Sequence, residues 1–434
     1  MVSIGMVTAR IRQQIWDPLY RNSFFLMADT VVASGLGFFF WMVVARFYSE
    51  AEVGLAVALL SSVLLIGLFS RLGLDYALIR FLPKAERPAD LMNSSFTVSG
   101  LAVIILSAIF LAGLDLWAPT LRLLRENAFF AIVFAITALL FSTSCLLNCV
   151  FIGKRRAEFV MSNDVILSLL KIPIPILLAA SLHAFGIVAS WGIAAAVALT
   201  VSLLLFIPRA QDRYQPAVRL DVAGLKGIWS FSAAYYLFSL FSMSPNFILP
   251  IMIVNLVSAE QNAYFYVAWA IASLLYAIPG AVSGSLLAEG SHFEDELAPK
   301  ASSALRLSFI ILVPALIILF LAGRWLLMLF GASYATNGLD LLWWLALSSL
   351  PLAANRVYLS ILGVRYRVKE LAVISGITAL VLLWGSYLLL PAFGIVSIGY
   401  LLVGTEAAKG IYTVYRYKRA VAPATSPTSG PPLV

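Results

Sequence analysis

The sequence predicts an all-α membrane protein with twelve transmembrane helices, arranged as two similar lobes of six helices each. Three observations predict this fold. The composition is 62% hydrophobic and only 12% charged, and the mean hydropathy of +0.96 lies far outside the range of water-soluble domains. The apolar residues are gathered into long runs, and three short sequence patterns recur in the second half of the chain.

Twelve runs are long and apolar enough to cross a bilayer, which takes about 20 predominantly apolar residues per helix. Because no water satisfies the backbone inside the hydrocarbon, and because no run alternates like a barrel strand, each run must be helical. The predicted spans are Ser23–Arg46, Glu52–Arg71, Asn93–Gly113, Asn127–Phe151, Val160–Ser181, Phe185–Ile207, Ile228–Asn255, Gln261–Leu287, Ser303–Gly323, Asn337–Gly363, Leu371–Leu390 and Phe393–Tyr415.

Three patterns recur 208 to 210 residues apart, which indicates a duplicated unit. They are Phe185–Val188 with Phe393–Val396, Ser49-x-x-Glu52 with Ser258-x-x-Gln261, and Gly153–Arg156 with Gly363–Arg367. Each serine pattern predicts a capping box at the start of a helix. Six helices per half is an even number, so both halves enter the membrane in the same direction. A parallel repeat of this kind is typical of transporters that move one lobe against the other around a central cavity.

Basic residues predict the orientation. With a cytoplasmic N-terminus, the inner segments hold 22 lysines and arginines and the outer loops hold four. This asymmetry places both termini in the cytoplasm and the chain in the cytoplasmic (inner or plasma) membrane. The basic residues are scattered over separate loops, so nothing indicates a nucleic-acid partner.

The domain organisation follows from the same pattern. We expect a cytoplasmic segment at 1–22, an N-lobe at 23–207, a polar cytoplasmic linker at 208–227 and a C-lobe at 228–417. The tail at 418–434 is rich in proline, serine, threonine and glycine, which predicts disorder.

Enzyme motifs are absent from the sequence. His183 and His292 lie on opposite sides of the membrane in this topology, so they cannot share a metal site. No phosphate-binding loop or nucleophile elbow is present. We interpret the stretch His292–Glu296 as a solvated acidic linker, and Cys145 and Cys149 as packing residues. The sequence therefore predicts no enzyme activity, no metal site and no cofactor.

Ionisable residues inside the predicted spans are the candidate functional residues, because each costs roughly 2.5–3.5 kcal/mol to insert. They are Asp29, Lys171, Arg356, Glu406 and Lys409. Three of the five are basic, which predicts a cavity that suits an anionic substrate. Arg71 and Arg80, at helix margins, are candidates for its cytoplasmic entrance. We expect Lys171 and Arg356, one per lobe, to meet the substrate.

Structural interpretations of the same residues stay open. Glu406 and Lys409 are one turn apart and could neutralise each other. Asp29 could pair with an arginine or be hydrated near the inner interface, and Arg356 could extend to that interface. Asp29 shares a face with Ala33 and Gly37, a small-residue stripe expected to point into a helix bundle.

Prolines predict breaks in three helices. Pro173 and Pro175 should distort the fifth span just beyond Lys171. Ser242–Asn246 should interrupt the seventh span, and Ile278–Gly280 the eighth. Interrupted spans are tolerated where backbone lines a cavity or packs on protein.

Two further stretches, Val43–Leu55 and Gly73–Pro83, give the sequence a family resemblance. With the echoes described above, they make it similar to the polysaccharide-export and O-antigen flippase branch of the multidrug/oligosaccharidyl-lipid/polysaccharide (MOP) flippase superfamily. The resemblance implies translocation of an undecaprenyl- or dolichyl-linked oligosaccharide, two lobes around a central cavity, H⁺ or Na⁺ as a coupling ion, and a glycan polymerase or glycosyltransferases as partners. Many relatives carry an acidic and then a basic residue where this chain has Asn246-Phe247, so Asn246 is the candidate there.

Two rival functions remain. A drug or cation antiporter of the same superfamily would need a cavity dominated by carboxylates, with Asp29 central. A membrane polymerase or glycosyltransferase would need a catalytic set that the short outer loops do not carry. Major facilitators also have six plus six helices, but their loop motif after the second helix is missing at Leu72–Asp75.

Overall fold

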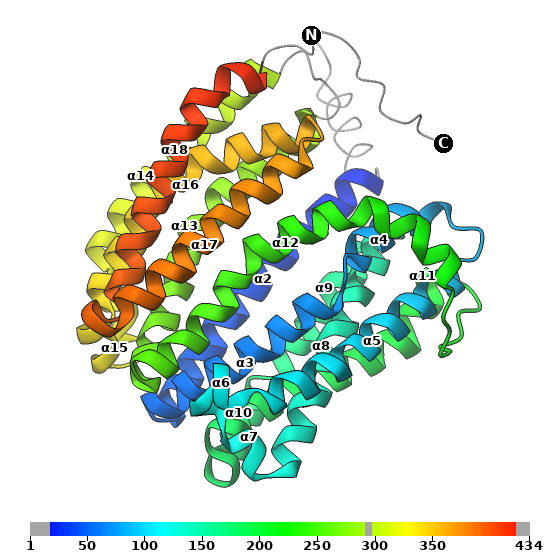
Figure 1. Ribbon diagram of the computed structural model, residues 1–434, viewed down its shortest axis with the longest axis horizontal. Coiled ribbons are helices and arrows are strands. Elements are labelled where there is room, and N and C mark those ends of the chain that lie inside the picture. Colours follow the sequence, from blue (N-terminus) through cyan, green and yellow to red (C-terminus); the bar gives the residue numbers. More distant parts are fainter. Residues whose placement is uncertain (1–17, 291–296, 422–434) are drawn as a thin grey trace, which may run out of the picture. The chain divides into compact units, whose positions relative to one another are not determined.

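The computed structural model describes residues 18–290 and 297–421, and all regular structure in these ranges is helical (Figure 1). The predicted acidic linker His292–Glu296, most of the N-terminal segment and nearly all of the tail lie outside the described residues. The chain divides into two compact units. The first contains the described residues up to Tyr266 with Leu329–Gly331, and the second contains Val267–Met328 and the residues from Ala332 onward.

The first unit contains most of the helices. They are α2 (Pro18–Phe47), α3 (Glu50–Ser70), α4 (Leu74–Phe81), η1 (Leu82–Lys84), α5 (Pro88–Ala112), α6 (Leu114–Trp117), η2 (Pro119–Leu121), α7 (Leu123–Glu126), α8 (Ala128–Gly153), α9 (Ala157–Leu170), α10 (Pro173–Val201), the π-turn η3 (Ser202–Phe206), α11 (Ile207–Ala210) and α12 (Val222–Leu256).

The second unit begins within α13, which runs through Ala259–Gly290 and so starts in the first unit. The remaining helices are α14 (Leu297–Met328), α15 (Ala332–Asn337), α16 (Leu339–Val364), α17 (Val368–Phe393) and α18 (Val396–Val421). Within this unit α16 packs against α14, α17 and α18. The predicted lobe boundary at 208–227 stays a prediction.

Ten helices in the described ranges are long and apolar enough to span a membrane. All twelve predicted segments are helical, but two do not qualify by length and composition. The fifth is divided, because α9 ends at Leu170. The twelfth, α18, is more polar because it carries Glu406 and Lys409. The all-helical membrane fold is confirmed, whereas the count of twelve and the cytoplasmic placement of both termini stay predictions.

The central helix of the first unit is α3, which contacts α8, α10 and α12. In the most apolar stretch of α3, 78% of the residues are buried, whereas 17% are buried in the corresponding stretch of α2. The predicted capping box starts this helix. The Ser49 backbone N–H donates to Glu52 Oε2 over 2.9 Å, and the Glu52 N–H donates to Ser49 Oγ over 3.3 Å. At the start of α13 the Gln261 N–H donates in the same way to Ser258 Oγ over 3.2 Å.

Two turns show the internal repeat in the backbone. The α8–α9 turn has a positive φ of 55° at Arg155, and the α16–α17 turn has 53° at Tyr366. In both turns the next residue, Arg156 or Arg367, donates its backbone N–H over 2.9 Å to a carbonyl of the preceding helix. The repeated sequence pattern Gly153–Arg156 and Gly363–Arg367 therefore corresponds to a turn with the same backbone geometry in both halves.

The Phe-Gly-Ile-Val echo behaves differently. In the second half Phe393 ends α17, and the break itself is Gly394 with φ of 63°. In the first half the break comes earlier, at His183 with φ of 48°, and Phe185 lies in the helix beyond it. The two copies are not at equivalent backbone positions, so this echo overstates the regularity of the repeat.

Prolines divide one helix and leave two others continuous. The prediction for Pro173 is confirmed, because α9 ends at Leu170 and Pro173 opens α10, where its missing N–H costs nothing. The predicted interruptions at Ser242–Asn246 and Ile278–Gly280 are wrong. Both α12 and α13 continue through these stretches. A proline removes one hydrogen bond of the helix, and the bonds on either side keep the helix continuous.

The segment before α12 is tied to α5 by polar side chains. Asn93 donates its amide to the Gln215 carbonyl over 3.0 Å and accepts from the Tyr214 hydroxyl over 2.7 Å. Further along, the Arg219 N–H donates to Thr97 Oγ1 over 3.2 Å. This polar stretch therefore lies along one helix of the first unit.

A close approach between α3 and α13 generates the first prediction. A Cβ on Gly54 would lie 1.6 Å from the Ala259 carbonyl oxygen, and Asn262 donates its amide to the Gly54 carbonyl over 2.7 Å. We expect Gly54→Ala to destabilise the protein by more than the roughly 1–3 kcal/mol typical of overpacking, because backbone must move. The measurement is the thermal unfolding midpoint of the purified protein in detergent.

Gly35→Ala is the matched control, since a Cβ there meets nothing within 4 Å. It should leave the midpoint unchanged or slightly higher. Equal midpoints for Gly54→Ala and the wild type would show that the two helices do not approach this closely.

Candidate functional site

Lys171 lies in the break between α9 and α10 and is only 6% exposed. Its Nζ stands 4.8 Å from the centroid of the Trp191 ring and 5.3 Å from that of the Phe40 ring. Aromatic faces attract a cation, and more strongly where water is excluded. The lysine is therefore held between rings from α10 and α2.

Asp164 is the described carboxylate whose charge acts on Lys171. It stands two turns earlier on α9, and its charge attracts the ammonium without a direct ion pair. Its Oδ1 accepts hydrogen bonds from Asn148 Nδ2 over 2.9 Å and from Asn163 Nδ2 over 3.0 Å. A buried carboxylate is stable only with such partners.

Asn163 connects this carboxylate to three helical segments and is fully buried. Its Nδ2 also lies 3.1 Å from Ser144 Oγ of α8, and its Oδ1 accepts from the Ser202 hydroxyl of η3 over 2.8 Å. We call Ser144, Asn148, Asn163, Asp164 and Ser202 the amide network. It fixes α8, α9 and η3 around the break at Lys171.

Asp29 lies on α2, the helix that packs against α9. Its Oδ1 is buried and has no hydrogen-bond partner among the described residues, and Asp164 acts on it by charge repulsion. A Cβ on Gly37, two turns further along, would meet nothing within 4 Å. The half-buried Gly37 therefore borders open space, and the expectation that the small-residue stripe points into a helix bundle stays a prediction.

The arrangement pairs two carboxylates with one ammonium. An unpartnered carboxylate oxygen in a buried site is satisfied by a proton or a small cation. Asp29 is one described residue with such an oxygen. The count of ionisable residues that predicted an excess of positive charge did not include Asp164. A sequence signal existed, because Asp164 and Lys171 are seven residues apart and so share a helix face.

In the second unit Glu406 and Lys409 satisfy each other. Lys409 Nζ lies 2.6 Å from Glu406 Oε1, and Asn355 donates to the other oxygen of Glu406 over 2.7 Å and to its carbonyl over 2.8 Å. Thr413 donates its hydroxyl to Asn355 Oδ1 over 3.0 Å. The geometry matches the structural interpretation, in which the pair is neutral and joins α16 to α18.

Arg356 and Asn246 are not part of either cluster. Arg356 is exposed on α16, next to the buried Asn355, and Asn246 is half-buried on α12. Within the described ranges neither side chain forms a hydrogen bond or an ion pair. Their roles stay predictions.

The two entrance candidates differ in their surroundings. Arg71 donates to the Gly67 carbonyl over 3.2 Å and pairs with Asp75 at 3.6 Å. Burial raises the pKa of Asp75, and Arg71 opposes that shift. The Tyr76 ring stacks on Tyr235 of α12 at 5.3 Å. Arg80 is exposed beside the Phe81 ring. Sequence reasoning did not identify Asp75, Tyr76 or Tyr235.

The amide network generates the second prediction. Asn163→Ala leaves the buried Ser202 hydroxyl without its acceptor and removes one of the two amide donors to Asp164, and a buried orphan costs about 1–3 kcal/mol. We expect a clearly lower thermal unfolding midpoint for the purified protein. Asn246→Ala is the matched control and should change the midpoint little, because that amide has no partner in the described ranges. Equal effects of the two substitutions would contradict the network.

Comparisons with known proteins agree with this architecture. Residues 19–288 match the family described as polysaccharide biosynthesis proteins. No curated protein matches the chain significantly. Among solved structures, the lipid II flippase MurJ in an inward closed conformation matches with a TM-score of 0.69 and 13% identity, covering 91% of this chain and 88% of that one.

Two further structures match over nearly their whole length. An inward-facing multidrug resistance MATE family transporter of the MOP superfamily gives a TM-score of 0.66 at 15% identity, covering 91% of this chain and 96% of that one. A MOP superfamily transporter from Pyrococcus furiosus, described as having a binding pocket of reverse polarity, matches with a TM-score of 0.65 and 17% identity. The match covers 93% of this chain and 95% of that one. Identities this low establish a common fold. The family match covers more than half of the chain, so the chain belongs to the family of polysaccharide biosynthesis proteins, and it shares its fold with these transporters.

Proposed function

We propose that the protein is a flippase that moves a lipid-linked oligosaccharide across the cytoplasmic membrane for the assembly of a cell-surface glycan, such as an O-antigen or another lipopolysaccharide component. The family match over residues 19–288 is the observation that carries the proposal. The fold shared with a lipid II flippase supports it. In this proposal one unit moves relative to the other during transport, and a glycan polymerase or glycosyltransferases supply and use the substrate.

Lys171 and Arg356 are proposed to contribute positive charge for the phosphate of the lipid carrier, with Arg71 and Arg80 guiding it from the cytoplasmic side. Moving negative charge outward gains about 2.3 kcal/mol per charge and 100 mV of inside-negative potential. Lys171 is enclosed by Phe40 and Trp191. Contact with a phosphate therefore requires one of these rings to move, and Phe40 lies on α2 together with Asp29.

Asp29 is proposed to couple transport to H⁺ or Na⁺. Its buried, unpartnered oxygen distinguishes it from Glu406, which Lys409 and Asn355 already satisfy. Binding of a cation at Asp29 would weaken its repulsion with Asp164 and so alter how α2 packs against α9.

A drug or cation antiporter is the second candidate function. The two facing carboxylates Asp29 and Asp164 favour it, because an acidic site attracts organic cations. Similarity to MATE structures fits both candidates. Expression in a strain lacking its own efflux pumps separates them, since an antiporter exports a cationic dye and the flippase does not.

The third prediction concerns the two basic residues. Lys171→Ala and Arg356→Ala should each abolish polysaccharide export in a flippase-deficient strain, while membrane levels of the protein stay normal. The measurement is surface polysaccharide by gel and antibody, with the protein quantified in membranes. Lys171→Met tests charge against volume, because methionine fills the space between the rings without an ammonium.

Lys369→Ala is the matched control, since Lys369 is an exposed lysine outside both clusters. It should complement fully. Full complementation by the double substitution Lys171→Ala and Arg356→Ala would remove both residues from the mechanism.

The fourth prediction concerns the coupling ion. In proteoliposomes loaded with a lipid-linked oligosaccharide, wild-type transport should accelerate when a proton or sodium gradient is imposed. Asn has the shape of Asp without its charge, so Asp29→Asn should transport at the same rate with and without the gradient. A variant that keeps the full response to the gradient would exclude Asp29 as the coupling residue.

A further inference from the structure

The N-terminal ends of α2 and α9 meet in the first unit, at residues that the proposed function does not use. Asn22 of α2 accepts a hydrogen bond at Oδ1 from the backbone N–H of Ala157, the first residue of α9, over 2.9 Å. The residue before this helix, Arg156, does not cap it with its own side chain. Because the first N–H groups of a helix need acceptors and asparagine is a preferred one, Asn22 caps α9 from a neighbouring helix.

An ion pair lies beside this cap. Arg21 Nη2 of α2 lies 3.0 Å from Glu158 Oε1, and Arg156 Nη1 lies 3.4 Å from the same oxygen. Arg156 is held beside α9, because its guanidinium carbon lies 4.8 Å from the centroid of the Phe159 ring. Glu158 therefore has one basic partner next to its own helix and one on α2. If α2 moved away, Glu158 would keep the partner next to α9.

These contacts fix the axial register of α2 and α9. Both helices begin at the contact, so they run away from it in the same direction. Asp29 follows Asn22 by seven residues, and Asp164 follows Ala157 by seven residues. Seven residues make about two turns of an α-helix and return to nearly the same face. The two carboxylates therefore stand at one level, on the helix faces that carry the cap.

The electrostatics agree with this register. The charge of Asp164 repels that of Asp29, and such an interaction weakens with distance, so the two carboxylates are close. Along its length α2 packs against α9. A slip of α2 by one turn would move Asp29 by about 5.4 Å along α9 and away from the level of Asp164.

We propose that Asn22 and Arg21 are positioning residues, which hold α2 on α9 in the register that keeps Asp29 level with Asp164. This role rests on the proposed coupling by Asp29. An ion pair through one oxygen of a partly exposed carboxylate is weak, so it sets the register without preventing α2 from moving during transport.

The fifth prediction tests the register without any transport. Spin labels are attached to Met27→Cys on α2 and Leu169→Cys on α9, two exposed positions, after Cys145 and Cys149 have been replaced by alanine. Double electron–electron resonance gives the distribution of label distances in the purified full-length protein, and we expect one narrow distribution. Asn22→Leu fills similar space without an acceptor and should broaden the distribution. Asn22→Asp offers an acceptor to the same N–H and should keep it narrow.

The same substitutions, without labels, are assayed in proteoliposomes with the gradient that accelerates wild-type transport. Asn22→Leu should lose the acceleration, and Asn22→Asp should retain it. Arg21→Ala should lose only part of the acceleration, because the Asn22 cap remains. A merely structural role would lower the yield of protein that elutes as a single peak in size-exclusion chromatography. It would not change the ratio of the rates with and without the gradient.

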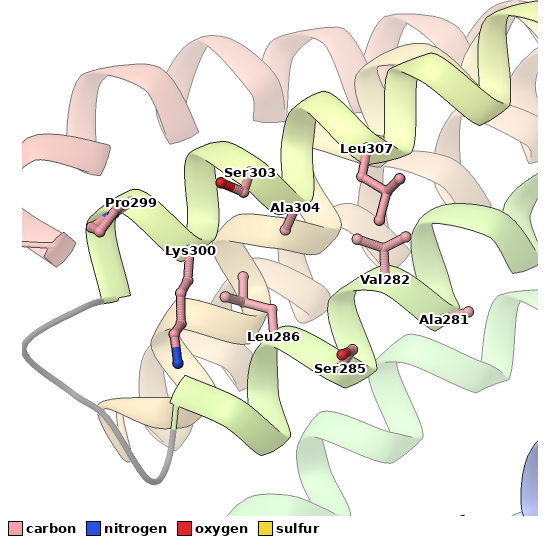
Figure 2. A pocket seen from close by; sticks show the side chains of 9 residues that line it. All are labelled: Ala281, Val282, Ser285, Leu286, Pro299, Lys300, Ser303, Ala304 and Leu307. Carbon is pink, nitrogen blue, oxygen red and sulfur yellow. The ribbon is translucent and has the colours of Figure 1, made fainter. Parts of the chain in front are cut away.

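Ser303→Ala is the matched control. Ser303 lines a groove of about 530 Å³ between α13 and α14 in the second unit, as Figure 2 shows. Its side chain is exposed and has no hydrogen-bond partner in the described ranges. This substitution should leave the distance distribution and the response to the gradient unchanged.

Two results would overturn the positioning role. An unchanged, narrow distribution in Asn22→Leu would show that the cap does not set the register. A broadened distribution with a full response to the gradient would show that coupling does not depend on the register. A wild type that responds to neither gradient would contradict the proposed coupling by Asp29, and with it this role of Asn22. The label distances distinguish that failure, because they are measured without substrate or gradient.

Discussion

The packing of α8, α9 and η3 in the first unit depends on how one half-buried carboxylate, Asp164, is satisfied. Within the described residues Asp164 forms no ion pair with an arginine or lysine, so the amides of Asn148 and Asn163 and the field of Lys171 stabilise its charge. Those amides come from α8 and α9, and Asn163 also binds Ser202 of η3. Losing the bond to Asn163 would leave the buried hydroxyl of Ser202 without its acceptor. The positions of three helical segments are therefore coupled to one charge.

The charged residues of the predicted spans have different kinds of partners in the two units. In the second unit, Glu406 has both an ammonium and an amide at hydrogen-bond distance. In the first unit, Asp29 keeps a buried oxygen without a partner, and Lys171 is held by aromatic faces instead of a carboxylate. A satisfied pair stabilises one conformation, whereas an unsatisfied carboxylate responds to the arrival of a proton or cation.

Local chemistry explains where prediction from the sequence succeeded. The capping box at Ser49 and Glu52 involves atoms three residues apart, and the break before Pro173 follows from one ring and one missing N–H. Prediction failed where packing against neighbouring helices decides the backbone conformation. Pro245 and Pro279 lie inside continuous helices, and the echo at Phe185 is offset from the break at His183. The sequence pattern alone does not show which of several allowed backbones the packing selects.

Hydropathy and charge determined the membrane environment and the all-helical class, because the lack of water in the bilayer leaves a chain of this composition few other structures. Helix periodicity could also have linked Asp164 to Lys171, since both lie on one helix face. Only the tertiary structure decided that Phe40 and Trp191 enclose the lysine and that Asn355 satisfies Glu406. It also decided that one buried oxygen of Asp29 has no hydrogen-bond partner among the described residues. These contacts join residues far apart in the chain, and their energies depend on distances and burial that no local pattern encodes.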